Sequence, residues 1–170
     1  MNGRKIWWSL PLLAALVAGV GVAMAATSMS SKSGTVNTAH SGKFGTILVS
    51  SSGMTLYRFT PDKKNASVCS GACTKYWPPL LVKGTAKPTA GSGTTASMLG
   101  TTRRANAAIQ VTYAGYPLYL YAGDKKPGDV SGQGFQGMWY VVNASGALVK
   151  HAVAASGSTT TTKKKSGGWG

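Results

Sequence analysis

The sequence predicts an all-β fold in which two tandem, related antiparallel β-hairpin units pack as one small domain with disordered termini. Three observations support this prediction: an internal duplication, short β-rich runs around turn glycines, and the lack of a helical hydrophobic period in either copy. The 170 residues suit a single domain once the polar ends are set aside.

The duplication appears when the chain is compared with itself, without gaps, at an offset of 62 residues. Residues 47–84 then show eleven identities, where chance would give about two or three. The identical pairs are Ile47 and Ile109, Val49 and Val111, Gly53 and Gly115, Leu56 and Leu118, Tyr57 and Tyr119, Asp62 and Asp124, Lys63 and Lys125, Lys64 and Lys126, Val68 and Val130, Trp77 and Trp139, and Gly84 and Gly146. We therefore divide a duplicated β domain, residues 44–154, into a first repeat (about 44–84), a linker (about 85–105) and a second repeat (about 106–150).

Each copy begins with a predicted hairpin. Residues 46–50 and 55–59 flank a turn at Ser52-Gly53, and residues 109–113 and 117–121 flank Ala114-Gly115-Tyr116. Because side chains alternate across a strand, the aromatic residues of each copy share one face and a leucine points the other way. The aromatic residues are Tyr57, Phe59, Tyr119 and Tyr121, and the leucines are Leu56 and Leu118.

A second hairpin is predicted within the second copy, around the turn at residues 143–146. Its counterpart in the first copy, residues 76–84, is interrupted by Pro78 and Pro79. Proline suits a sheet edge or the start of a strand, because it cannot donate a ladder hydrogen bond.

The first 25 residues have the pattern of a secretory signal peptide. Arg4 and Lys5 precede an uncharged apolar run that ends in Ala23-Met24-Ala25, so we expect cleavage after Ala25 and a secreted or extracytoplasmic protein. The alternative is a retained anchor, since the apolar run is about long enough to cross a bilayer. No cysteine ends that run, so we do not expect a lipid anchor.

Three polar segments are predicted to be flexible. Residues 26–43 and the basic tail, 155–170, are rich in Ser, Thr, Gly and Lys and contain few apolar groups, so burial cannot offset the entropy of ordering them. Residues 84–97 have the same composition and are predicted to loop between the two repeats.

The chain is strongly basic, with eighteen Lys and Arg against three Asp and no Glu. Such a surface favours anionic partners, which for an exported chain are envelope polymers or a membrane surface. No specific nucleic acid is predicted, and a basic surface that only keeps the protein soluble is the alternative. The oligomeric state does not follow from the sequence.

One spacing occurs in both copies: a tyrosine, any residue, an aromatic residue, two further residues, and an aspartate. It spans Tyr57 to Asp62 and Tyr119 to Asp124, and in the first copy Cys69, Cys73 and Trp77-Pro78-Pro79 follow. This pattern resembles a bacterial family of secreted repeats of unknown function, also described as predicted lipoproteins with a Yx(FWY)xxD motif. The resemblance covers about residues 44–150 and implies no activity. Trp139 is the repeat counterpart of Trp77.

Asp62 and Asp124 are the main candidates for chemistry. As turn residues they would accept hydrogen bonds from nearby backbone amides, and each could also accept the hydroxyl of the tyrosine five residues earlier. The alternative is a carboxylate pair that meets across a pseudo-twofold axis and hydrolyses a substrate by general acid and base catalysis.

Cys69 and Cys73 are the only cysteines, and in an exported chain they are expected to form a disulfide across a small irregular loop. The alternative is redox or metal use, for example a copper site with Met54 or Met138 as a further ligand. We expect no cofactor and no metal. The sequence therefore favours a non-enzymatic envelope or extracellular binding module; a redox or metal-handling accessory protein is second and a hydrolase third.

Overall fold

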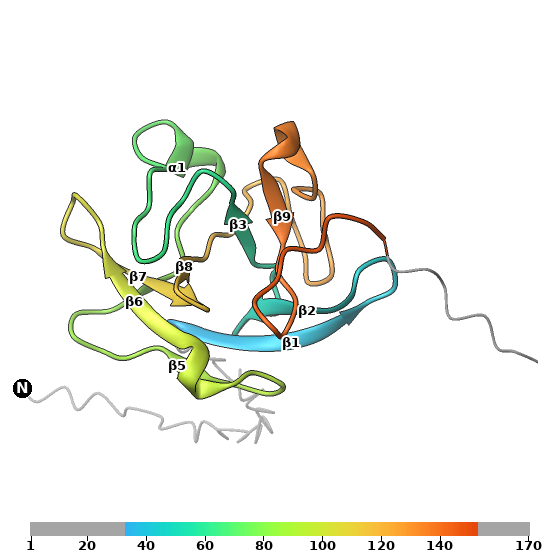
Figure 1. The fold of residues 1–170 in the computed structure, drawn as a ribbon, viewed down its shortest axis with the longest axis horizontal. Helices are drawn as coiled ribbons and strands as arrows, with labels where there is room; N and C mark the ends of the chain where they lie inside the picture. The colour runs from blue at the N-terminus through green and yellow to red at the C-terminus, as the bar shows by residue number, and fades with distance from the viewer. Residues whose placement is uncertain (1–32, 153–170) are drawn as a thin grey trace, which may run out of the picture. The chain divides into compact units, whose positions relative to one another are not determined.

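The computed structural model describes residues 33–152 (Figure 1). The predicted signal peptide, 1–25, and the predicted flexible basic tail, 155–170, lie outside the described residues, as does the first part, 26–32, of the predicted flexible N-terminal segment. Residues 33–152 contain no helix that is long and apolar enough to cross a membrane.

The described part of the chain consists mainly of short strands, as the sequence predicts. The strands are β1 (Thr35–Ser41), β2 (Gly45–Ser50), β3 (Tyr57–Phe59), β4 (Leu81–Val82), β5 (Thr89–Ala90), β6 (Leu99–Arg103), β7 (Ile109–Tyr113), β8 (Tyr116–Pro117) and β9 (Trp139–Val141). Between them lie one helical turn, α1 (Cys73–Tyr76), and two 3₁₀ turns, η1 (Ala96–Met98) and η2 (Phe135–Gly137). All strand pairs are antiparallel except β1 with β5. The prediction of an all-β fold of antiparallel units is confirmed.

The sheets combine strands from both copies. The orders are β2-β1-β5, β3-β9 and β4-β7-β6, with β8 also paired to β7. Strand β3 of the first copy pairs with β9 of the second, and β4 of the first pairs with β7 of the second. Each copy therefore completes a sheet of the other.

The predicted hairpins are present. In the first copy, Ser50 N–H donates to the Met54 carbonyl at 2.8 Å, which closes the turn around Gly53. In the second, β7 and β8 pair across Ala114 and Gly115, whose φ angles of 51° and 84° suit a tight hairpin turn. The hairpin after β9 is closed by a bond from Asn143 N–H to the Ala147 carbonyl at 3.0 Å.

The predicted flexibility of residues 26–43 is wrong for the part that the structure describes. Strand β1 runs along β2, with Val36 opposite Ser50 and Ser41 opposite Gly45. Val36 is fully buried. A polar strand with one buried apolar side chain is stabilised by its ladder and its neighbours, which composition does not reveal.

The predicted linker, residues 85–105, is also structured. It contains β5, η1 and β6, and β6 pairs with β7 along its whole length. Its glycines mark close packing: a Cβ added at Gly91 would lie 1.8 Å from the Asn37 side-chain oxygen. Small residues that we interpreted as a flexible loop therefore allow two segments to approach each other.

The β1–β2 and β6–β7 hairpins are equivalent, although the ungapped comparison did not reveal it. Ile47 pairs with Ala39, and its repeat counterpart Ile109 pairs with Arg103, so β1 and β6 are related by an offset of 64 rather than 62 residues. Between these paired positions, the hairpin of the first copy is thus two residues longer than the hairpin of the second. The duplication extends upstream of the predicted boundaries.

Two hydrophobic clusters lie on opposite faces of the motif strands. The predicted alternation is confirmed: Leu56 and Leu118 belong to an aliphatic cluster, whereas Tyr57 and Tyr119 belong to an aromatic one. Both leucines and both tyrosines are fully buried. The aromatic cluster contains the candidate site.

Candidate functional site

The two motif tyrosines bond across the repeats. The Tyr57 hydroxyl donates to Asp124 Oδ2 at 2.7 Å, and the Tyr119 hydroxyl donates to Asp62 Oδ2 at 2.6 Å. The backbones of the tyrosines also bond reciprocally, N–H to carbonyl, at 2.9 and 3.0 Å. Our expectation that each carboxylate would accept the tyrosine of its own copy is wrong, because the hairpins bring each tyrosine to the other copy's aspartate.

The second oxygen of each motif carboxylate fixes a local turn. Asp62 Oδ1 accepts the Val68 amide and Asp124 Oδ1 accepts the Ser131 amide, both at 2.8 Å. This part of the turn prediction is confirmed. Each carboxylate therefore holds its own loop with one oxygen and the opposite repeat with the other.

Burial changes the proton affinity of these groups. Desolvation raises the pKa of Asp62, although the Tyr119 hydroxyl and the Val68 amide act in the opposite direction. Desolvation, followed by the bond to a carboxylate, raises the pKa of both Tyr57 and Tyr119 well above the ordinary tyrosine value. Both hydroxyls thus stay protonated and act as donors at neutral pH.

The third acid, Asp129, binds backbone amides of its own turn. Its Oδ2 accepts the Lys125 and Lys126 amides at 2.9 and 3.1 Å. These bonds hold the pKa of Asp129 below its ordinary value.

Four aromatic rings stack in a row beside the Tyr–Asp pairs. Trp77 and Trp139 are parallel, with ring centroids 3.8 Å apart and an interplanar angle of 1°. Phe59 stacks on the outer face of Trp139 at 4.3 Å, and Tyr121 on that of Trp77 at 4.4 Å. The order along the row is Phe59, Trp139, Trp77 and Tyr121. Reading the row from the other end replaces each residue with its repeat counterpart, so the stack has an approximate two-fold symmetry.

The tyrosines of the crossed pairs support this stack at its edges. The Tyr57 ring meets Trp77 edge-on at 5.4 Å, and the Tyr119 ring meets Trp139 edge-on at 5.1 Å. Edge-to-face contacts of this kind add about 0.5–1.5 kcal/mol beyond area burial. All the predicted motif and aromatic residues therefore meet in one cluster.

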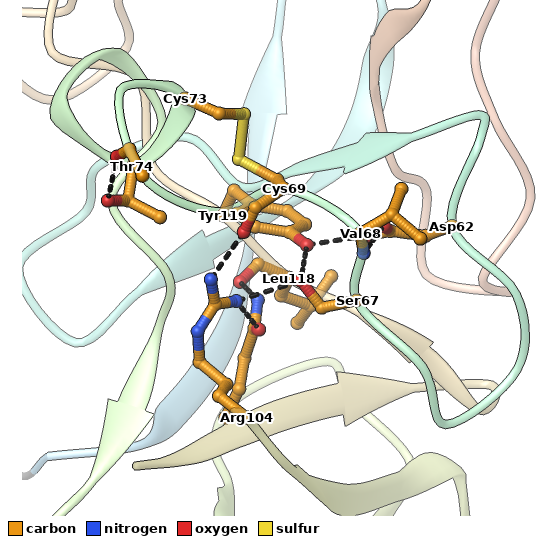
Figure 2. The surroundings of a disulfide bond; sticks show 11 residues. Asp62, Ser67, Val68, Cys69, Cys73, Thr74, Arg104, Leu118 and Tyr119 are labelled. Atoms are coloured by element: carbon orange, nitrogen blue, oxygen red, sulfur yellow. Dashed lines mark hydrogen bonds between the residues drawn. A yellow bond between two sulfur atoms is a disulfide. The ribbon is translucent and has the colours of Figure 1, made fainter. Parts of the chain in front are cut away.

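Cys69 and Cys73 form the predicted disulfide, with Cα atoms 5.5 Å apart (Figure 2). The bridge closes an irregular loop that enters α1, and Gly71 within it has a φ of 54°. Cys69 is buried in the aromatic cluster, so the bridge ties that loop to the core.

Arg104 connects the disulfide loop to the first carboxylate (Figure 2). Its guanidinium contacts the Cys69 carbonyl and the Gln110 side-chain oxygen, and donates to the Ser67 hydroxyl at 2.8 Å. The Ser67 oxygen lies 2.6 Å from the Tyr119 hydroxyl. Because Tyr119 donates its proton to Asp62, Ser67 is the donor in this bond, and a directed chain runs from Arg104 to Asp62.

Sequence reasoning missed Arg104 and Ser67, because the network that they form is not duplicated. In the other copy, the Gly132 amide occupies the corresponding place and donates to the Tyr57 hydroxyl at 3.3 Å. Gly132 also has to be glycine, since a Cβ there would lie 2.7 Å from the Trp77 ring. The glycine-rich segment around Gly132 thus packs on the aromatic stack at this position.

A groove of about 370 Å³ opens beside the stacked tryptophans. We call it the aromatic groove; it is lined by Phe59, Cys73, Tyr76, Trp77, Phe135, Gln136, Met138 and Trp139. Its walls come from α1 in the first copy and from η2 with the residue after it in the second, two segments that rise on the same side of the fold (Figure 1). Tyr76 and Met138 are repeat counterparts at the offset of 62, so the repeat relation in the sequence links the two walls of the groove.

The geometry of the cysteines and of the motif aspartates affects the metal, redox and hydrolase alternatives. The cysteine sulfurs are joined to each other, and residues 33–152 contain no group of three or more His, Cys, Asp or Glu side chains placed to hold a metal ion. Asp62 and Asp124 each accept a phenol and an amide. These bonds use the carboxylates for structure, and the open surface beside them is aromatic.

Comparison with known proteins identifies a family whose model matches this chain. A family model described as a secreted repeat of unknown function matches residues 30–81 and, a second time, residues 100–143. Together the two segments cover more than half of the chain. No curated protein and no solved structure matches.

Proposed function

Because the chain belongs to a family of secreted repeats of unknown function, we propose that it is an extracellular or cell-envelope module that binds anionic polymers and catalyses no reaction. The predicted signal peptide, with cleavage after Ala25, supports this location. An exported basic protein meets acidic polysaccharides, polyphosphates and anionic lipid headgroups at the cell surface.

The observation that carries the proposal is the distribution of charge. Residues 33–152 contain twelve Lys and Arg and three Asp, a formal charge of +9. Two of the three carboxylates are buried and the third binds backbone amides of its own turn. Ten of the twelve cations are exposed: Lys43, Lys63, Lys64, Lys75, Lys83, Lys87, Arg103, Lys125, Lys126 and Lys150. The surface therefore attracts anions and has few acidic groups to oppose them.

The use of the motif residues supports a binding role over hydrolysis. A hydrolase of this kind needs a carboxylate free to take a proton from water and a second one free to give a proton. Asp62 and Asp124 instead hold the two repeats together through Tyr119 and Tyr57. A redox or metal function would first require reduction of the Cys69–Cys73 bond.

The test is the salt dependence of polymer binding. The chain from Ala26 onward should bind inorganic polyphosphate at 50 mM salt and lose most of that affinity by 200 mM, because binding releases counterions and exposed charges are screened within about 10 Å at 0.1 M. Uncharged dextran serves as the control polymer and should not bind.

Matched variants locate the binding charge. Replacing Lys63, Lys64, Lys125 and Lys126 with Gln, or deleting residues 156–170, should weaken polyphosphate binding and reduce its salt dependence. Binding that is insensitive to salt, or preference for the neutral polymer, would overturn the proposal.

A further inference from the structure

The aromatic groove has the dimensions and position of a ligand site. Its volume of about 370 Å³ falls within the range of small-ligand pockets. It lies where the two copies meet, with Trp77 and Trp139 side by side at its base. The base is rigid because both tryptophans are buried and stacked on further rings.

The rim of the groove exposes aromatic surface to solvent. Tyr76 is 64% exposed and Phe135 is 39% exposed, one on each wall. Apolar side chains that are exposed singly are common, whereas two exposed rings that line one concavity can mark a ligand-binding groove. Both rings are available to a ligand in the groove.

The polar groups of the groove include a phenol and an amide. Tyr76 and Gln136 are both exposed, and both side chains line the groove. Both can donate and accept, so they suit a ligand that carries hydroxyl groups. No Lys, Arg, Asp or Glu lines the groove itself.

We propose that the aromatic groove binds the sugar rings of an anionic polysaccharide. A pyranose ring offers an apolar C–H face to an aromatic side chain and a rim of hydroxyls to an amide and a phenol. The acidic groups of the same polymer would reach the exposed cations outside the groove, of which Lys75 is the sequence neighbour of Tyr76. This inference rests on the proposed function and names the polymer class for it.

The lining favours a polysaccharide over single-stranded nucleic acid because the phenol and the amide match a ring that carries several hydroxyls. Bases also stack on aromatic side chains, and the acidic groups of either polymer would have to reach cations outside the groove, so charge does not separate the two. Here the groove contains no cation, and the described cations lie outside it. Nucleic acid is therefore the competing outcome of the test.

The experiment compares polymers that share charge but differ in rings. The chain from Ala26 onward, Tyr76→Ala, Phe135→Ala and the control Val68→Ala are titrated with polygalacturonate, inorganic polyphosphate and oligodeoxythymidylate at low salt. Val68 is 57% exposed and does not line the groove, so its replacement removes apolar surface elsewhere. Near-ultraviolet circular dichroism verifies that the stacked tryptophans are intact in each variant.

We expect Tyr76→Ala and Phe135→Ala to weaken polygalacturonate binding about tenfold each. Polyphosphate binding should stay within about twofold, and Val68→Ala should match the parent with every polymer. Unchanged polygalacturonate affinity, or equal losses with polygalacturonate and polyphosphate, would overturn the groove assignment and leave the proposed function standing. A loss of affinity confined to oligodeoxythymidylate would show that the groove binds nucleic-acid bases and not sugar rings. A parent protein that binds no anionic polymer would overturn both proposals.

Discussion

At the scale of single residues, the two motif aspartates explain why acidic residues persist in so basic a chain. Each has one oxygen on a backbone amide of its own loop and the other on the tyrosine of the opposite copy. Asp62 and Asp124 are only 5% and 6% exposed, so loss of either would leave buried donors without an acceptor. No lysine or neutral apolar side chain could accept these bonds.

The consequence is a graded loss of stability. Asp62→Ala and Asp124→Ala should each lower the free energy of unfolding by about 1–3 kcal/mol for every donor left unpaired. Asp→Asn should cost less, because the amide keeps one acceptor oxygen. Equivalent changes in the two copies should behave alike, since the contacts are equivalent. Urea unfolding of the four variants measures these differences.

Asp129→Asn provides the control for that series, because this carboxylate lies in a turn outside the crossed pairs and should affect stability little. Four motif variants as stable as the parent would contradict the structural role. They would make a functional carboxylate site the better explanation of the motif.

At the scale of elements, the disulfide loop joins α1 to the motif network. The bridge holds Cys69 in the aromatic cluster, and Arg104 links the Cys69 carbonyl to Ser67 and so to the Tyr119–Asp62 pair. The second copy has no cysteines and uses the Gly132 amide at the corresponding place. The loop of the first copy therefore depends on a bridge that its counterpart does without.

Removing the bridge should destabilise the domain moderately. For so short a loop, the chain-entropy model gives about 2 kcal/mol. Cys69→Ala combined with Cys73→Ala should lower the urea midpoint by a corresponding amount, and a reductant should lower that of the parent but not of the double variant. Two free thiols in the untreated secreted protein would contradict the structure.

The elements that were predictable are those with a local signal. The turn at Gly115 and the alternation around Tyr119 predict β7, β8 and the motif strand. The sequence shows a glycine that can adopt a positive φ and a two-residue alternation of side chains. Strands β1 and β6 were missed because their pairing depends on contacts and not on composition. The two extra residues between the paired positions of the first hairpin also removed them from the ungapped comparison.

The sequence predicted which motif residues form the site but not how those residues are arranged. Duplication identified Tyr57, Asp62, Trp77 and their counterparts, and all of them meet in one cluster. The crossing of the pairs follows from how the copies pack, which no local pattern encodes. Arg104 has no repeat counterpart in that network, so comparison of the copies could not find it.

At the scale of the whole molecule, contacts between the two copies hold the described domain together. These contacts are the Tyr–Asp hydrogen bonds, the row of stacked rings, in which the two copies alternate, and the β3–β9 and β4–β7 strand pairs. In each case one partner comes from each repeat. A single copy would expose Trp77 or Trp139 and leave a buried tyrosine hydroxyl without its carboxylate.

Unfolding should therefore be one cooperative transition, although the sequence is a tandem repeat. Tandem repeats that only touch their neighbours can unfold in steps, whereas here removal of either copy breaks the buried contacts of the other. In a Trp169→Phe background, near-ultraviolet circular dichroism reports the Trp77–Trp139 stack and far-ultraviolet dichroism reports the sheets. The two signals should give the same urea midpoint and slope, as a two-state domain requires. Asp62→Ala and Asp124→Ala should shift both signals together, whichever copy carries the change. Loss of the stack at a lower urea concentration than the sheets would contradict this prediction, as would a variant that shifts only part of the transition. Either result would mean that the copies are separate folding units. The crossed Tyr–Asp pairs would then join two preformed modules and would not create a single one.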